Sequence, residues 1–138
     1  MTEVRLRACP DYEREHCRAA LEAVCGGLSW VQPGMKIGVK VNLVAGAPPE
    51  KAVTTHPALV AALTELLIEH GASVVVGDSP GGLFTPAFLQ RVYHLSGYEA
   101  VEQAGATLNT DCEIRETDFP QGAVLHRFSY TAWLDSCD

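Results

Sequence analysis

The sequence has few basic residues and no long apolar run, and each of these absences excludes a class of function. Ten Lys and Arg residues stand against 17 Asp and Glu residues, which gives a net charge of −7 at pH 7. Nonspecific binding to nucleic acid needs a basic face, so we expect no nucleic-acid partner. No apolar run approaches the roughly 20 residues of a membrane span, and the charged start MTEVRLRACPDYERE lacks a signal core. The sequence therefore predicts a cytoplasmic protein with no membrane partner.

The cysteines are also poorly arranged for a metal or for disulfides. There are five of them, an odd number, and no CxxC pair occurs. Cys9, Cys17 and Cys25 are spaced too widely for one metal knuckle. Free intracellular thiols are the expectation, with Cys17 packed in the core as a small apolar side chain.

Two common phosphate-binding fingerprints are absent as well. The turn GDSPGG at residues 77–82 matches neither GxGxxG nor GxxxxGK[ST]. The chain also lacks a complete set of nucleophile, base and orienting group. The sequence leaves open whether the protein is an enzyme.

The sequence does have a regular alternation of apolar strands and amphipathic helices. Its hydrophobic pattern predicts strands over residues 3–7, 36–41 and 73–77, and helices over 11–26 and 57–70. This order is typical of a single α/β domain that covers the whole chain. We expect a three-layer sandwich with a mostly parallel sheet, right-handed crossovers and a Rossmann-like order of elements.

The C-terminal part carries weaker signals. Residues 86–106 predict one or two short helices, broken near Ser96 and Gly97. The stretches TLNT, EIRET and AVLHRFSY are candidate edge strands.

Polar residues gather in the two loops that follow the strands expected at 36–41 and 73–77. In open α/β sheets, ligands bind at the carboxyl ends of the strands, and the first of these loops is too long to be explained as a connection alone. Taken singly, each residue can be explained as a helix cap or a turn. Together they predict a ligand-binding set: Lys40, Asn42, Thr54, Thr55, His56, Asp78, Ser79, Gly81 and Gly82.

Each of these residue types suits a small anionic or metal-bridged ligand. Lys40 would neutralise charge, and the amides of the glycine turn would hold anionic oxygens. Asp78 would coordinate a divalent cation or orient a hydroxyl of the substrate. His56 would carry a proton, because the pKa of free histidine lies near neutrality.

Three blocks of the sequence resemble the domain of unknown function 362 family. KVNLVAGAPPEKAVTTHPALVAAL and VVVGDSPGG are similar to its Lys-Pro-Asn-Leu strand end, its Thr-Thr-His-Pro helix start and its Gly-Asp-Ser-Pro-Gly turn. GYEAVEQAGATL fits the segment that follows, so the resemblance covers roughly residues 1–117. It implies an α/β domain, but the biochemical activity of the family is not established.

The chain departs from the family pattern in two ways. Val41 stands where the family usually has proline. The family domain normally continues further, and many members carry an iron–sulfur module with four cysteines per cluster. The chain therefore resembles the N-terminal part of a longer domain, and no iron–sulfur cluster is expected on its own cysteines.

Three functions stay open at this point. The first is the small-ligand or metal site just described, and the second is a part of an iron–sulfur-linked redox enzyme whose other half is missing. The third is a noncatalytic module that forms a homodimer. The segment AVLHRFSYTAWL at residues 123–134 is rich in large apolar side chains, which mark an interface when they are exposed. It either folds back onto the sheet or, as we favour, packs against a second copy.

Overall fold

A three-stranded parallel sheet forms the centre of the fold in the computed structural model, which describes residues 3–138. Its strands are β1 (Lys36–Lys40), β2 (Ser73–Gly77) and β3 (Thr107–Leu108), in the order β1-β2-β3. Two further strands, β4 (Ile114–Asp118) and β5 (Arg127–Thr131), pair with each other in an antiparallel ribbon. The expected α/β class with a parallel sheet is confirmed.

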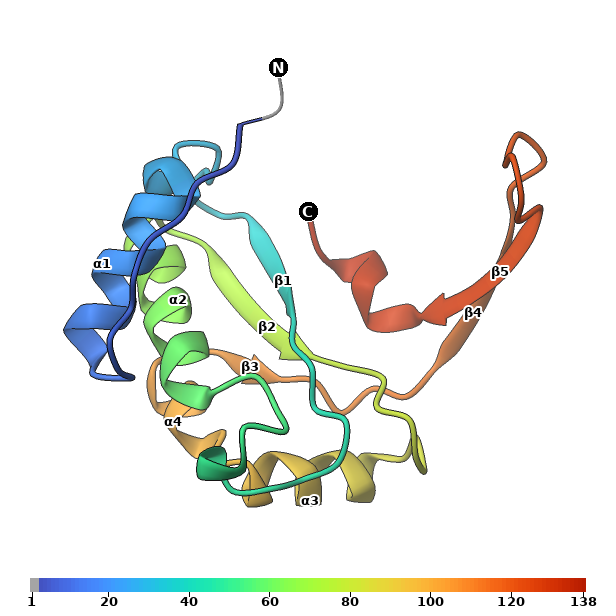
Figure 1. Ribbon diagram of the computed structural model, residues 1–138. Coiled ribbons are helices and arrows are strands. Elements are labelled where there is room, and N and C mark those ends of the chain that lie inside the picture. The colour runs from blue at the N-terminus through green and yellow to red at the C-terminus, as the bar shows by residue number, and fades with distance from the viewer. Residues whose placement is uncertain (1–2) are drawn as a thin grey trace.

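The helices lie on one face and at one end of this sheet (Figure 1). Helices α1 (Arg14–Cys25), α2 (Pro57–Glu69) and α4 (Glu99–Gln103) lie side by side next to the sheet. Helix α3 (Pro86–Leu95) crosses below the carboxyl ends of the strands. Within residues 3–138, no helix is both long enough and apolar enough to cross a membrane.

The main core lies between the parallel sheet and these helices. Alternate strand residues such as Val74 and Val76 are buried there, together with Leu66 and Leu67 of α2. Each large apolar side chain that is removed from water contributes about 1.5–3 kcal/mol. This burial explains why the apolar stripe of α2 and the continuous apolar run of β2 were readable from the sequence.

The other face of the sheet is covered by the C-terminal 3₁₀ turn Ala132–Ser136 rather than by helices. The indole of Trp133 is 5% exposed and lies over two strand glycines. A Cβ atom built on Gly77 would lie 2.9 Å from Trp133 Cζ2, and one on Gly38 would lie 3.2 Å from Cζ3. Glycine stands at both strand positions because the indole needs that space.

The strand expected over residues 3–7 is wrong. Residues 3–10 have no regular structure and run along α1 instead of entering the sheet. Val4 and Leu6, which alternate as a strand would require, are 76% and 91% exposed. The alternation shows only that Val4 and Leu6 would lie on the same face of an extended chain. Within residues 3–138, this segment has no neighbouring strand to pair with and no apolar surface to pack against.

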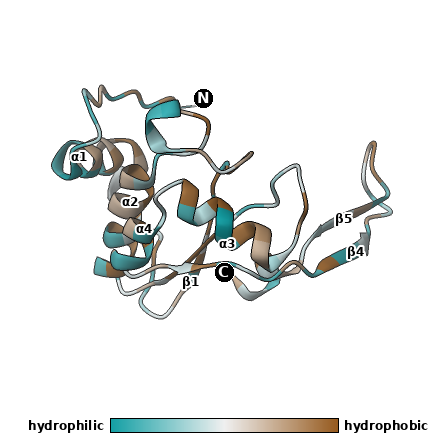
Figure 2. Ribbon diagram, turned by 90° about the horizontal axis from the view of Figure 1, so that it is seen from below, coloured by the Kyte–Doolittle hydropathy of each residue, from teal (hydrophilic) through white to brown (hydrophobic). Residues whose placement is uncertain are grey.

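The C-terminal segment folds back onto the sheet only in part. Ala132 and Trp133 fold back and are buried within the chain. The ribbon of β4 and β5 instead extends away from the rest of the molecule (Figures 1 and 2).

Candidate functional site

An ion pair joins the ends of the two neighbouring parallel strands. Lys40 is in register with Gly77, so Asp78 follows directly beside it. The two side chains meet with 2.8 Å between Lys40 Nζ and Asp78 Oδ1. The second carboxylate oxygen, Asp78 Oδ2, accepts a hydrogen bond of 2.8 Å from the main-chain N–H of Leu43. The carboxylate thus fixes both the lysine and the first turn of the loop after β1.

Burial differs sharply between the two partners of this pair. The Asp78 side chain is 5% exposed, whereas that of Lys40 is 64% exposed. The ammonium has three donors; one binds Asp78 and another donates to the carbonyl of Val41 at 3.0 Å. One donor of a fixed, solvent-accessible cation therefore stays free.

The long loop after β1 is closed at its base by a second pair of predicted residues. The main-chain N–H of Asn42 donates to Thr55 Oγ1, and the N–H of Thr55 donates to the Asn42 carbonyl, both at 2.9 Å. The Tyr98 hydroxyl also donates to the Thr55 carbonyl at 2.9 Å. These contacts bring the start of α2 to the same edge of the sheet as Lys40.

His56 has a structural position at that edge. Its Nδ1 accepts from the N–H of Ala58 at 3.2 Å and so caps α2. Its ring stacks on Tyr12, with centroids 3.6 Å apart and planes 7° apart. Burial lowers the pKa of His56 and favours the neutral ring that these contacts require.

A cavity of about 230 Å³ connects the ion pair to the C-terminal segment. Its lining includes three residues from the predicted set, Lys40, Asp78 and Ser79. The rest of the lining comes from the C-terminal segment: Ser129, Tyr130, Thr131, Trp133 and Leu134. These residues were missed because they are distant in the sequence and carry no local motif.

One buried polar group in the lining lacks a partner. Trp133 Nε1 is buried and donates to no acceptor within residues 3–138. A buried donor without an acceptor costs about 1–3 kcal/mol. The indole N–H is shielded from solvent, so an acceptor reaches it only when the indole or its neighbours move.

The remaining predicted residues lie outside the cavity. Six residues of the predicted set are not among those that line it: Asn42, Thr54, Thr55, His56, Gly81 and Gly82. Gly81 has open space around its Cα, and a Cβ on Gly82 would contact the Phe88 ring at 3.1 Å. The structure thus brings together the strand-end residues of the predicted set but not the tip of the glycine turn.

The charges around Asp78 bear on its predicted metal role. Both of its oxygens already accept hydrogen bonds, one of them from a cationic ammonium. A second cation at this carboxylate would be repelled by Lys40. Within the part of the chain that the structure describes, no three His, Cys, Asp or Glu side chains gather in a metal-binding arrangement.

The cysteines of the described range are free thiols spread over the fold. Cys17 is fully buried on α1, as expected for core packing. Burial raises the pKa of its thiol to about 11.

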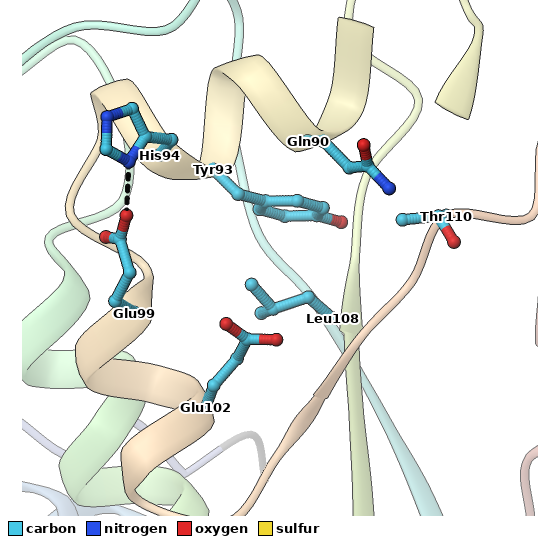
Figure 3. A pocket seen from close by; sticks show the side chains of 7 residues that line it. All are labelled: Gln90, Tyr93, His94, Glu99, Glu102, Leu108 and Thr110. Carbon is cyan, nitrogen blue, oxygen red and sulfur yellow. Dashed lines mark hydrogen bonds and ion pairs between the residues drawn. The ribbon is translucent and has the colours of Figure 1, made fainter. Parts of the chain in front are cut away.

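A second cavity, of about 270 Å³, lies between α3, α4 and the end of β3 (Figure 3). Tyr93 and Leu108 lie in its middle, with His94 and Glu99 paired at one end. The Tyr93 hydroxyl is already bound to the Asn109 carbonyl at 2.9 Å. No sequence motif marked this cavity, and its lining has the carboxylates of Glu99 and Glu102 but no lysine or arginine.

Together, the fold and the Lys40 cavity define a parallel α/β domain with a hollow beside an ion pair at the carboxyl ends of its strands. The sequence model of the family described as "Domain of unknown function (DUF362)" matches residues 37–138. The chain belongs to this family. The match begins at β1 and runs to residue 138, whereas the motifs suggested residues 1–117.

One curated relative and the solved structures complete the comparison. The thylakoid-associated protein sll1697 of Synechocystis sp. is 38% identical over 63 residues, which are 46% of this chain and 20% of the relative. The chain thus spans about a fifth of the length of this relative. No solved structure matches the chain.

Proposed function

We propose that this domain binds a small anion in the Lys40 cavity, at the carboxyl edge of the parallel sheet. The observation that carries the proposal is the fixed and accessible ammonium of Lys40. Asp78 holds it in place at 2.8 Å, and the lysine side chain stays 64% exposed. The free donor of this ammonium is available to a carboxylate or phosphate oxygen. The Asp78 carboxylate offsets part of its charge, so the neutral donors of the cavity must also contribute to anion binding.

The neutral donors of the cavity support the same ligand class. Ser79, Ser129 and Thr131 bring hydroxyl groups to the lining. The buried N–H of Trp133 has no acceptor within residues 3–138, so an anion that shifts the indole would satisfy a donor that is otherwise unpaired. Ser79 belongs to the predicted set, and the other donors extend it.

The size of the cavity limits the ligand. Sites for drug-sized ligands are about 300–1,000 Å³, and this cavity is about 230 Å³. An inorganic anion or a small carboxylate fits these dimensions better than a nucleotide does.

The broader expectations from the sequence stay predictions. They are a metal ion at Asp78, a part in an iron–sulfur-linked redox enzyme, and a cytoplasmic location. The printed name of the Synechocystis relative describes that protein as thylakoid-associated, which gives a second location to examine for this chain.

The test uses Trp133 as a built-in reporter. The chain has two tryptophans, and the other, Trp30, is 55% exposed and is not among the residues that line the Lys40 cavity. In a W30F variant the emission therefore comes from Trp133 alone, and the lysine variants below assign a response to the Lys40 cavity. We expect saturable changes in Trp133 emission with inorganic phosphate or acetate, but not with sodium chloride or magnesium chloride at matched ionic strength.

Two lysine variants locate the binding site. K40M, in the W30F background, should abolish the saturable response because it removes the fixed cation. K51M removes an exposed lysine of the 3₁₀ turn Pro49–Lys51, away from the cavity lining, and should leave the response intact. A response that survives K40M, or no saturation with either anion, refutes the proposal.

A further inference from the structure

The ribbon of β4 and β5 exposes several large apolar side chains. Both strands stand away from the sheet, and Figure 2 shows hydrophobic segments along them. Val124 near the tip is 84% exposed and Ile114 is 62% exposed. Isolated two-stranded hairpins are only marginally stable in water, so this ribbon needs a partner surface.

The hydrogen-bond pattern shows which main-chain groups are free for such a partner. The N–H of Ala132 donates to Glu113, and that of Phe119 donates to His126. Bonded and non-bonded pairs alternate in an antiparallel ladder. The N–H and C=O groups of the β5 residues Arg127, Ser129 and Thr131 therefore point to the outer edge, where they have no partner within residues 3–138.

The two outer edges of the ribbon differ in charge. Strand β4 (IRETD) carries Arg115, Glu116 and Asp118, whereas β5 (RFSYT) carries Arg127 alone. Arg127 is already paired with Asp118 at 2.7 Å. Natural edge strands use charge to resist pairing, so β4 is the protected edge and β5 is the open one.

We propose that β5 pairs with β5 of a second copy of this chain, in an antiparallel arrangement with a twofold axis at Ser129. The outward groups match this arrangement, because Ser129 then bonds to its own copy and Arg127 to Thr131 of the second copy. The result is a four-stranded sheet of two ribbons. Dimers with twofold symmetry are the commonest oligomers of soluble proteins.

The side chains suit the same register. Phe128 then lies directly opposite Tyr130 of the second copy on one face of the sheet, and this contact occurs twice. Aromatic cross-strand pairs stabilise antiparallel sheets. Within each ribbon, Phe128 already contacts Tyr130 and Phe119, with ring centroids 6.1 and 6.5 Å apart, so the pairing joins two aromatic clusters into one.

Pairing of β4 with β4 of a second copy is unfavourable when the twofold axis lies near the middle of the strand. A twofold axis at Glu116 of β4 would place two glutamates opposite each other, and an axis at Thr117 would oppose Glu116 and Asp118. Like charges directly opposite are destabilising. The charges on the two edges therefore favour pairing through β5, whose outward groups match those of a second copy.

This dimer does not depend on the anion site, but the two are adjacent. Ser129, Tyr130 and Thr131 line the Lys40 cavity, so the strand of the second copy lies beside one of its walls. The failure of either proposal leaves the other standing, because dimerisation and anion binding are measured separately.

The first experiment is sedimentation velocity of the purified chain at several concentrations, with a matched pair of proline variants. Ser129 and Glu116 are directly opposite each other in the ribbon, and both point their N–H outward. S129P removes the central donor of the proposed interface, and E116P removes the equivalent donor on the other edge. Proline is tolerated where the N–H faces outward from an edge.

The wild-type chain should dimerise, and S129P should weaken the dimer by at least about tenfold, because both central main-chain hydrogen bonds are lost. E116P should dimerise as the wild type does, and far-UV circular dichroism should show that both variants are folded. A monomeric wild type at high micromolar concentration overturns the proposal, and so does equal behaviour of the two variants.

A cross-linking experiment keeps the proposal testable if the proline variants misfold. In a C9S background, which removes the exposed native thiol, S129C should form an intermolecular disulfide on oxidation with diamide. A residue on the twofold axis faces its copy with about 5.5 Å between Cα atoms, within disulfide range. E116C is the control, and equal cross-linking of E116C and S129C contradicts the proposed register.

Discussion

Replacing Gly77 with alanine tests the contact between the end of β2 and the C-terminal segment. The new Cβ would lie 2.9 Å from Trp133 Cζ2 and 3.0 Å from Asn109 Cβ. Carbon atoms in favourable contact are about 3.5–4.0 Å apart, so the indole or the strand must move. The indole is 5% exposed and packed against two strands, which leaves it little freedom to move.

The magnitude follows from two opposing effects. Inserting a methyl group into a well-packed site costs about 1–3 kcal/mol. Replacing glycine in a strand recovers about 0.5–1 kcal/mol of conformational entropy, and Gly77 has no positive φ that would make alanine strained. We expect G77A to lower the free energy of unfolding by about 1–2 kcal/mol.

Equilibrium urea unfolding, followed by far-UV circular dichroism, measures this cost in two backgrounds. In W133L the contacts with the indole are gone, whereas the contact with Asn109 Cβ remains, so the cost of G77A should fall but not vanish, and the double-mutant cycle should show coupling of about 1 kcal/mol or more. G81A is the control, because no atom lies within 4 Å of the Cβ added there. Equal costs in both backgrounds, or equal effects of G77A and G81A, would refute the packing argument.

Three further predictions concern the loops around the cavity. D78A should cost about 1–3 kcal/mol in urea unfolding, because the buried N–H of Leu43 loses its acceptor; D78N, which keeps an oxygen acceptor, should cost less. Y98F should cost about 0.5–1.5 kcal/mol by the same measurement, since the hydroxyl that donates to Thr55 is removed. Burial lowers the pKa of His56 below its usual value of 6.5. The neutral His56 ring therefore contributes to stability above pH 6.5, and this contribution is lost as the pH falls through the lower pKa of the folded state. Thermal unfolding of H56N, which retains a capping oxygen without titrating, should therefore change less than the wild type between about pH 7.5 and pH 5, and an identical pH dependence would contradict this role.

The strand-end part of the site could be predicted because parallel strands impose it. Once β1 and β2 are adjacent and parallel, Lys40 and Asp78 must leave the sheet at the same edge, and the observed register places them side by side. The closure between Asn42 and Thr55 follows from the same topology, because the loop has to return to the start of α2. These positions depend on strand and helix periodicity, which the sequence carries locally.

The contribution of the C-terminal segment could not be predicted in this way. Trp133 packs on the sheet through a contact that is distant in the sequence. The two glycines beneath it, Gly38 and Gly77, are the only sequence feature that reflects this contact. A glycine in a strand has several possible causes, and none of them predicts which side chain packs against it. The failed strand at residues 3–7 has a related cause, since the alternation of Val4 and Leu6 specifies a face but not the neighbour that must cover it.

The turn GDSPGG therefore combines positions with different physical tasks. Gly77 makes room for the indole on one face of the sheet. Asp78 turns its carboxylate to the loop after β1 and fixes Lys40 there, whereas Gly81 lies in open space. A strand ends on an aspartate here because that carboxylate is buried against a main-chain donor and a lysine, and glycine precedes it because a tryptophan from the far end of the chain must pack there. The motif is therefore a junction between the sheet, the loop and the C-terminal segment, and the cavity proposed to bind an anion exists only where all three meet.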